Sequence, residues 1–144
     1  MENRNTNFEF NFTTKAAPAE VFMFLKNPFN WWMGVYGESI EGKSEVVNDE
    51  FSFRAGNGAH YSLQRLVELT TNRKIVWEVT DSKLSFLDNT GEWIGTSFSF
   101  MIEQKEGLTS ITFTHHGLVP EIECYTSCSG GWTQYLTKLQ SHFN

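Results

Sequence analysis

The sequence lacks the features that usually bring a protein to a membrane or to nucleic acid. No uninterrupted apolar stretch approaches the roughly 20 residues that a membrane-spanning helix needs. The polar opening MENRNTNFEF has no apolar run typical of a signal peptide. Basic residues are few and scattered, with eleven Lys and Arg against seventeen Asp and Glu and a net charge of −6, whereas nucleic-acid binders usually carry a basic patch. We therefore expect a cytoplasmic protein without a membrane span or a nucleic-acid partner.

Cysteine is also scarce. Cys124 and Cys128 are the only two, too few for a disulfide framework. They lie four residues apart on an expected helix, and His115 and His116 end the strand before it. Zinc sites usually combine close cysteine spacings with a further pair of ligands, whereas buried cysteines commonly act as small apolar side chains. We expect both cysteines to pack in the core, and neither a metal nor another cofactor.

No complete catalytic motif is present. The G-x-S-x-G elbow is missing, and no Ser, His and Asp stand in a convincing order. Residues 37–44 match the phosphate-loop pattern G-x-x-x-x-G-K-[ST], but such a loop must open a helix, and the following EVVNDEFSF favours a strand and a turn. Glu38 and Glu41 would also repel a phosphate. We name no catalytic residue and interpret the match as a coincidence.

Hydrophobic periodicity indicates an α+β fold in one domain over residues 1–144. Residues 7–14 alternate as a half-buried strand. The following APAEVFMFLKN favours a buried helix with Pro18 in its first turn, and NPFNWWMG adds a second short helix. From there to residue 116 the sequence predicts short alternating strands joined by tight turns, one of them at Asn57-Gly58. This pattern is typical of an antiparallel sheet.

The last part of the chain predicts a long amphipathic helix. Its apolar stripe runs from Cys124 to Phe143 at helical spacing. Two adjacent glycines interrupt it, at roughly 0.5–1 kcal/mol each relative to alanine. Gly131 lies near the edge of the stripe, so we expect it to let the helix approach a neighbouring element closely, with Trp132 beside it. Gly130 lies on the far side, and we interpret it as a weak point of the helix.

Aromatic residues are abundant, with thirteen Phe, five Trp and four Tyr making up 15% of the chain. Such residues either fill a core or line a cavity, and the sequence leaves both open. Alternation places many of them on the inward faces of strands or on the apolar stripe of the last helix. We predict this set of cavity-lining residues: Phe51, Phe53, Tyr61, Trp77, Phe98, Phe100, Phe113, His115, Trp132 and Tyr135.

The sequence allows two roles for His115. It shares a strand face with Ile111 and Phe113 and should point toward the last helix. A histidine there can orient a ligand or act as a general base. More often such a residue is a hydrogen-bonded part of the core.

Three stretches of the sequence resemble the START-like (SRPBCC) superfamily, in particular its branch related to the heat-shock ATPase activator homologues. They are FNFTTKAAPAEVFMFLKNPFNWW, RLVELTTNRKIVWEVTD and ITFTHHGLVPEIECYTSCSGGWTQYLTKLQ, and together they span nearly the whole chain. The resemblance implies a helix-grip fold: a curved antiparallel sheet of about six or seven strands wrapped around a long C-terminal helix, with two short helices after the first strand.

The resemblance also implies a hydrophobic cavity between the sheet and the last helix. Proteins of this superfamily bind lipids and hormones, cyclise polyketides or activate chaperones, so the fold alone does not give the function. The aromatic faces favour a protein that binds a hydrophobic or aromatic small molecule. A cyclase- or hydrolase-type enzyme with a pocket His or Tyr, a chaperone-interacting module and a homodimer all stay open.

Overall fold

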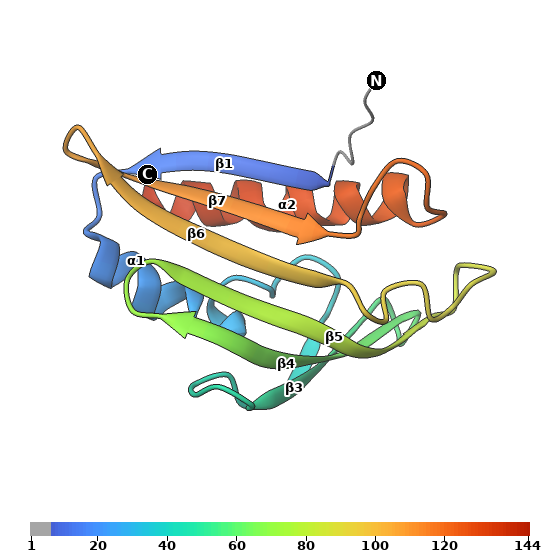
Figure 1. The fold of residues 1–144 in the computed structure, drawn as a ribbon. Coiled ribbons are helices and arrows are strands. Elements are labelled where there is room, and N and C mark those ends of the chain that lie inside the picture. Colours follow the sequence, from blue (N-terminus) through green and yellow to red (C-terminus); the bar gives the residue numbers. More distant parts are fainter. Residues whose placement is uncertain (1–6) are drawn as a thin grey trace, which may run out of the picture.

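The computed structural model describes residues 7–144, which form a curved antiparallel sheet, a long helix and two short helices (Figure 1). In chain order the elements are β1 (Phe8–Thr14), α1 (Pro18–Leu25), the 3₁₀ helix η1 (Pro28–Asn30), β2 (Ser39–Gly42), β3 (Glu50–Ala55), β4 (His60–Thr70), β5 (Lys74–Leu84), β6 (Ser97–Lys105), β7 (Leu108–His116) and α2 (Tyr125–Phe143). Among the described residues, no helix is long and apolar enough to cross a membrane.

The seven strands form one sheet in the order β1-β7-β6-β5-β4-β3-β2, and every pairing is antiparallel. Alternation sends one face of each strand inward, as Phe100 and Phe113 show by lying opposite each other on β6 and β7. The helix α2 runs along β1 and β7, and α1 lies near β6 (Figure 1). The predicted helix-grip α+β fold is confirmed, with α1 and η1 as the two short helices after the first strand.

The connection between β5 and β6 holds the start of α2. The carboxylate of Glu92 accepts hydrogen bonds from the backbone N–H groups of Glu123 and Cys124, both at 2.9 Å. These two amides come just before the first residue of α2, and a negative charge at this end complements the helix dipole. Glu123 in turn accepts from the backbone N–H groups of Asp88 and Asn89. Two irregular segments are thereby fixed to each other at one end of the sheet.

The stretch that matches the phosphate-loop pattern is part of the sheet. It forms β2 and the turn after it, and no helix follows. Gly42 has φ +122°, and a Cβ at this position would collide with the backbone of Glu50. The Ser44 hydroxyl donates to the Lys26 carbonyl at 2.9 Å and accepts from Trp77 Nε1 at 2.9 Å. The serine and glycine therefore have structural roles.

Candidate functional site: an aromatic cavity at one end of the sheet

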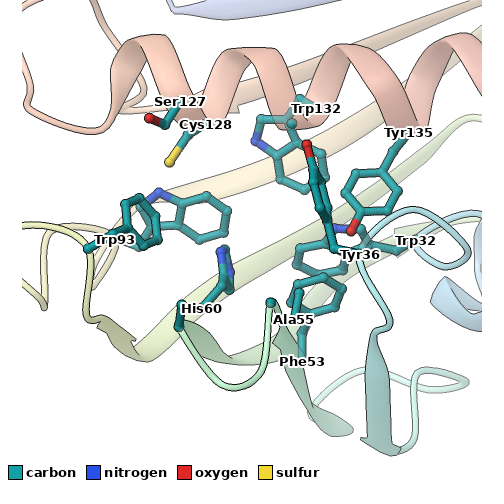
Figure 2. Close-up of a pocket in the computed structure, with 14 residues that line it drawn as sticks. Trp32, Tyr36, Phe53, Ala55, His60, Trp93, Ser127, Cys128, Trp132 and Tyr135 are labelled. Atoms are coloured by element: carbon teal, nitrogen blue, oxygen red, sulfur yellow. The ribbon is translucent and has the colours of Figure 1, made fainter.

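One end of the sheet holds a cavity of about 250 Å³ that is partly open to solvent. Its walls come from the segment between η1 and β2, the β3–β4 hairpin, the β5–β6 connection and the first half of α2 (Figure 2). Most of the wall is aromatic, and among residues 7–144 no Asp, Glu, Lys or Arg contributes to it. The lining residues are Trp32, Tyr36, Phe53, Ala55, Gly56, Ala59, His60, Phe86, Trp93, Ser127, Cys128, Gly131, Trp132 and Tyr135.

Three tryptophans from three different segments form the main apolar surface of the cavity. Trp32 stacks on Phe53 with ring centroids 3.8 Å apart and planes 10° apart. Trp132 of α2 lies 5.0 Å from Trp32, and Trp93 is nearly parallel to Trp132 at 5.9 Å. All three are at most 3% exposed, so the contacts between these large rings fix the shape of the wall.

A hydrogen-bond chain behind the wall fixes the Trp132 ring. Its indole Nε1–H donates to His115 Nδ1 at 2.9 Å. His115 Nε2 lies 2.9 Å from the Thr96 hydroxyl, which itself donates to the Trp93 carbonyl at 2.7 Å. An indole can only donate, so Nδ1 of His115 must accept and Nε2 must carry the proton. Both nitrogens of a neutral His115 are therefore occupied.

Burial lowers the pKa of His115 to about 3, with smaller contributions from His116 and His60. Protonating Nδ1 would also break its hydrogen bond with Trp132. The ring is thus neutral near neutral pH and has no free lone pair, which a general base requires. Of the two readings of His115, the structure favours the hydrogen-bonded core residue.

His60 is the histidine that lines the cavity. It begins β4, where it pairs with Ala55 of β3 and so shares the inward face of that residue. Its ring stands edge to face with Trp93 at 4.7 Å and with Phe53 at 5.1 Å. Nε2 lies 3.4 Å from the Ser62 hydroxyl. Burial lowers the pKa of His60 to about 4, so this ring is also neutral near neutral pH.

A loop of residues 33–38 closes the cavity beside α2. The Tyr135 hydroxyl donates to Glu38 at 2.5 Å, and this carboxylate also accepts from the backbone N–H groups of Gly34, Val35 and Tyr36. Burial acts to raise the pKa of Glu38, but these hydrogen bonds outweigh it and lower the pKa to about 2. Burial and the bond to Glu38 raise the pKa of Tyr135. The Tyr135 hydroxyl is therefore neutral and hydrogen-bonded to this loop.

Sequence comparison places the chain in a family. The family described as "Activator of Hsp90 ATPase homolog 1-like protein" matches residues 15–144. The chain belongs to this family. No curated protein matches the chain in its sequence.

Several solved structures share the fold of this domain. The solution structure of the Aha1 dimer from Colwellia psychrerythraea has a TM-score of 0.73 and 22% identity, covering 96% of both chains. CalU16 from Micromonospora echinospora has a TM-score of 0.66 and 11% identity, covering 94% of this chain and 74% of its own. Ginseng major latex-like protein 151 from Panax ginseng has a TM-score of 0.64 and 12% identity, covering 96% of this chain and 97% of its own. At these identities the likeness shows the fold alone.

The two cysteines of this family member form a pair in the structure. Both are buried, as predicted, and Cys128 lines the cavity. Beyond the predicted burial, Cys124 and Cys128 are joined as a disulfide, which the sequence alone did not indicate. One helical turn brings their Cα atoms to 5.5 Å, within the range that a disulfide spans. Among residues 7–144, no group of three His, Cys, Asp or Glu side chains is placed to hold a metal ion.

The structure brings three of the predicted cavity residues to the cavity: Phe53, Trp132 and Tyr135. Six others are buried in the interior and do not line the cavity: Phe51, Trp77, Phe98, Phe100, Phe113 and His115. Tyr61 lies on the opposite face of the sheet, where the Arg54 guanidinium stands 4.7 Å above its ring. The inward assignment of Tyr61 is wrong, because the turn ends at Ala59 and puts His60 on the inward face.

Sequence reasoning missed six aromatic or polar lining residues: Trp32, Tyr36, His60, Phe86, Trp93 and Ser127. Trp32, Tyr36 and Trp93 lie in irregular segments, where no periodicity marks an inward face. The pairing of His60 with Ala55 would have followed from placing the hairpin turn at residues 56–59. The predicted turn at Asn57-Gly58 already gives this pairing when residues are counted outward from it on both sides.

Proposed function

We propose that the protein binds a compact apolar or aromatic molecule in this cavity. The observation that carries the proposal is an open, uncharged, tryptophan-lined space in a protein whose remaining interior is filled by aromatic rings. Ligand sites are typically concave and mostly apolar, with a few polar groups that orient the ligand. Proteins with the fold of this family commonly bind hydrophobic ligands, which also supports a binding role for the cavity.

The size of the cavity limits the ligand. Its volume of about 250 Å³ exceeds the roughly 150 Å³ of an engineered cavity that binds benzene. It lies just below the range of roughly 300–1,000 Å³ that is common for drug-sized ligands. A molecule with one or two rings fits this space better than a long-chain lipid. Naphthalene is therefore a suitable first probe.

Gly131 contributes open space to the cavity. A Cβ added at this position would meet no heavy atom within 4 Å, and Gly131 lines the cavity wall. The expected close approach of another element at Gly131 is therefore wrong. Gly130 likewise has nothing within 4 Å of an added Cβ, but it is exposed and does not line the cavity. The two neighbours provide a matched pair for testing the site.

The test compares Gly131→Leu with Gly130→Leu. Leucine at position 131 would occupy the cavity, whereas leucine at position 130 would project into solvent. We expect naphthalene to raise the melting temperature of the unaltered protein and of Gly130→Leu, and to have no effect on Gly131→Leu. Circular dichroism checks that both variants keep the fold. Equal stabilisation of both variants, or none of the unaltered protein, would contradict the proposed function.

The two side chains that an acid–base enzyme could use here, His115 and Tyr135, are engaged in hydrogen bonds within the protein. Both nitrogens of His115 are hydrogen-bonded, and the Tyr135 hydroxyl is bonded to Glu38 with its pKa raised. We therefore infer binding without acid–base chemistry at these two residues. His115→Asn keeps an amide oxygen that can accept the Trp132 hydrogen bond. Loss of turnover of an identified substrate in this variant, with the fold kept by circular dichroism, would contradict this inference.

A further inference from the structure

Two adjacent rings in the cavity wall have hydrogen-bonding capacity that the rest of the described chain leaves unused. The Trp93 Nε1–H is buried and has no partner among residues 7–144. Within the same range, the side chain of His60 has one hydrogen bond, the long contact of Nε2 with Ser62. The two ring centroids are 4.7 Å apart. The Trp93 nitrogen has no accessible surface, so a ligand in the cavity does not reach it. Because His60 lines the cavity and an incompletely paired polar group in an apolar site is costly, the unused hydrogen-bonding capacity of His60 points to a polar atom of a ligand.

The position of His60 suits it to meet such an atom. The residue lies at the end of the β3–β4 hairpin, and its ring stands edge to face with Phe53 and Trp93. Figure 2 shows the ring rising from the hairpin toward the space between Trp93 and Trp132. A ligand ring held by the tryptophans would therefore present one edge to the His60 nitrogens.

The charges around the cavity favour a neutral ligand. In the described part of the chain no charged side chain lines it, and the full sequence carries a net charge of −6. An anion would enter without a counter-charge, which is strongly unfavourable in an apolar site. Burial lowers the pKa of His60 to about 4, so the ring does not supply a positive charge near neutral pH. A hydroxyl group both donates and accepts, so it can bond His60 in either neutral tautomer.

We propose that the cavity binds small neutral phenols, with the ligand hydroxyl hydrogen-bonded to His60 and the aromatic ring held among Trp32, Trp93 and Trp132. This inference rests on the proposed function and adds the ligand class and its polar anchor. The aromatic wall supplies most of the binding, and His60 selects ligands that carry the hydroxyl. In a wall without such an anchor, the hydroxyl would weaken binding, since its desolvation would be uncompensated.

Naphthalene and 2-naphthol test the proposal because they differ by one hydroxyl. Their dissociation constants are measured by isothermal titration calorimetry for the unaltered protein and for His60→Phe, which keeps a planar ring but loses the nitrogens. We expect His60→Phe to weaken 2-naphthol binding about tenfold, as loss of one buried hydrogen bond would, and to leave naphthalene binding within about twofold. His142→Phe is the matched control, because His142 stacks on Phe24 at the other end of α2, and it should change neither constant.

Each outcome decides something different. If both probes bind and His60→Phe weakens them equally or not at all, the hydroxyl anchor is wrong and the cavity remains a binding site. If neither probe binds the unaltered protein, the proposed function fails together with this inference. Should His60→Phe not fold, the ¹⁵N signals of the His60 ring in the unaltered protein decide. They should shift with 2-naphthol and much less with naphthalene, and equal shifts would overturn the anchor.

Discussion

Two regions of the interior use aromatic side chains in opposite ways. In the filled core, defined by Trp77, Phe98, Phe100 and Phe113, the rings interlock at centroid distances of 5.2–6.1 Å and are at most 1% exposed. At the cavity, rings from irregular segments face small residues instead. Ala55, Gly56, Ala59 and Gly131 stand in its wall, and the space that larger side chains would fill stays open.

The comparison shows that aromatic content does not decide between a core and a cavity. Regular strands alternate and bring bulky rings from β5, β6 and β7 against each other. Loops carry Trp32 and Trp93 to a place where the neighbouring helix and hairpin have little side-chain volume. Whether a space remains depends on the partners of the rings, as expected for interiors that are otherwise closely packed.

The largest effect is expected in the filled core. Phe98 is fully buried and contacts Trp77, Phe113 and Trp132. Phe98→Ala should lower the free energy of unfolding by about 3–5 kcal/mol, because it removes apolar contacts and leaves a cavity. Phe86 lines the existing cavity and is 48% exposed, so Phe86→Ala should cost less than about 1 kcal/mol. Urea denaturation compares the two, and similar losses would break the distinction between the regions.

The next effect is a dependence of stability on pH. Burial lowers the pKa of His60 to about 4 and that of His115 to about 3, from 6.5. The unfolded chain takes up protons below pH 6.5 while the folded protein does not, so stability is present above that pH and falls as acid is added. Each histidine contributes a slope of up to about 1.4 kcal/mol per pH unit. The urea concentration at the unfolding midpoint should fall as the pH is lowered from 6.5 to 4. His60→Phe should reduce the slope of stability against pH. An unchanged slope would show that His60 is not buried as described.

A smaller effect is expected at the loop that closes the cavity. Tyr135→Phe removes the hydrogen bond to Glu38 and should lower the free energy of unfolding by about 1 kcal/mol. Because the pKa of Glu38 is lowered to about 2, the carboxylate that holds the loop contributes stability above about pH 4.5 and loses it as the pH falls through 2. Tyr61→Phe on the outer face is the control and should be nearly neutral, since its ring stays under Arg54. Equal losses in thermal melts would contradict the role of the Tyr135 hydroxyl.

The smallest effect distinguishes open space from close packing at the adjacent glycines. An added Cβ meets no heavy atom within 4 Å at Gly130 or Gly131. Alanine should therefore raise stability at both positions, by up to about 1 kcal/mol through helix propensity. Thermal melts of Gly130→Ala and Gly131→Ala measure this directly. A loss of stability in Gly131→Ala alone would indicate that Gly131 does pack closely against a neighbouring element, as the sequence predicted.

The regular part of the fold follows directly from the sequence. The alternation of Ile111, Phe113 and His115 predicted β7 with its inward face, and the apolar stripe predicted α2. These patterns are readable because a strand or helix repeats its orientation at a fixed period. The start of α2 was harder to place, because the group that binds the two amides just before it is Glu92, more than thirty residues earlier in the chain.

The cavity was only partly predictable for the same reason. Phe53, Trp132 and Tyr135 lie on regular elements and were assigned to its wall. Trp32 and Trp93 lie outside strands and helices, so only their tertiary contacts reveal that they face the cavity. Phe98 and Phe100 point inward as predicted but meet other rings. Periodicity gives the direction of a side chain and not the volume left in front of it.

The most direct measurement follows the five tryptophan indole N–H signals during a titration with naphthalene. Trp32, Trp93 and Trp132 line the cavity, whereas Trp31 and Trp77 are buried in contact with Phe100 and donate their N–H groups to Leu25 and Ser44. In ¹H–¹⁵N spectra, naphthalene should shift the three cavity signals and leave the other two in place. Equal shifts in all five signals, or none in the cavity set, would contradict the account of one open site beside a filled core.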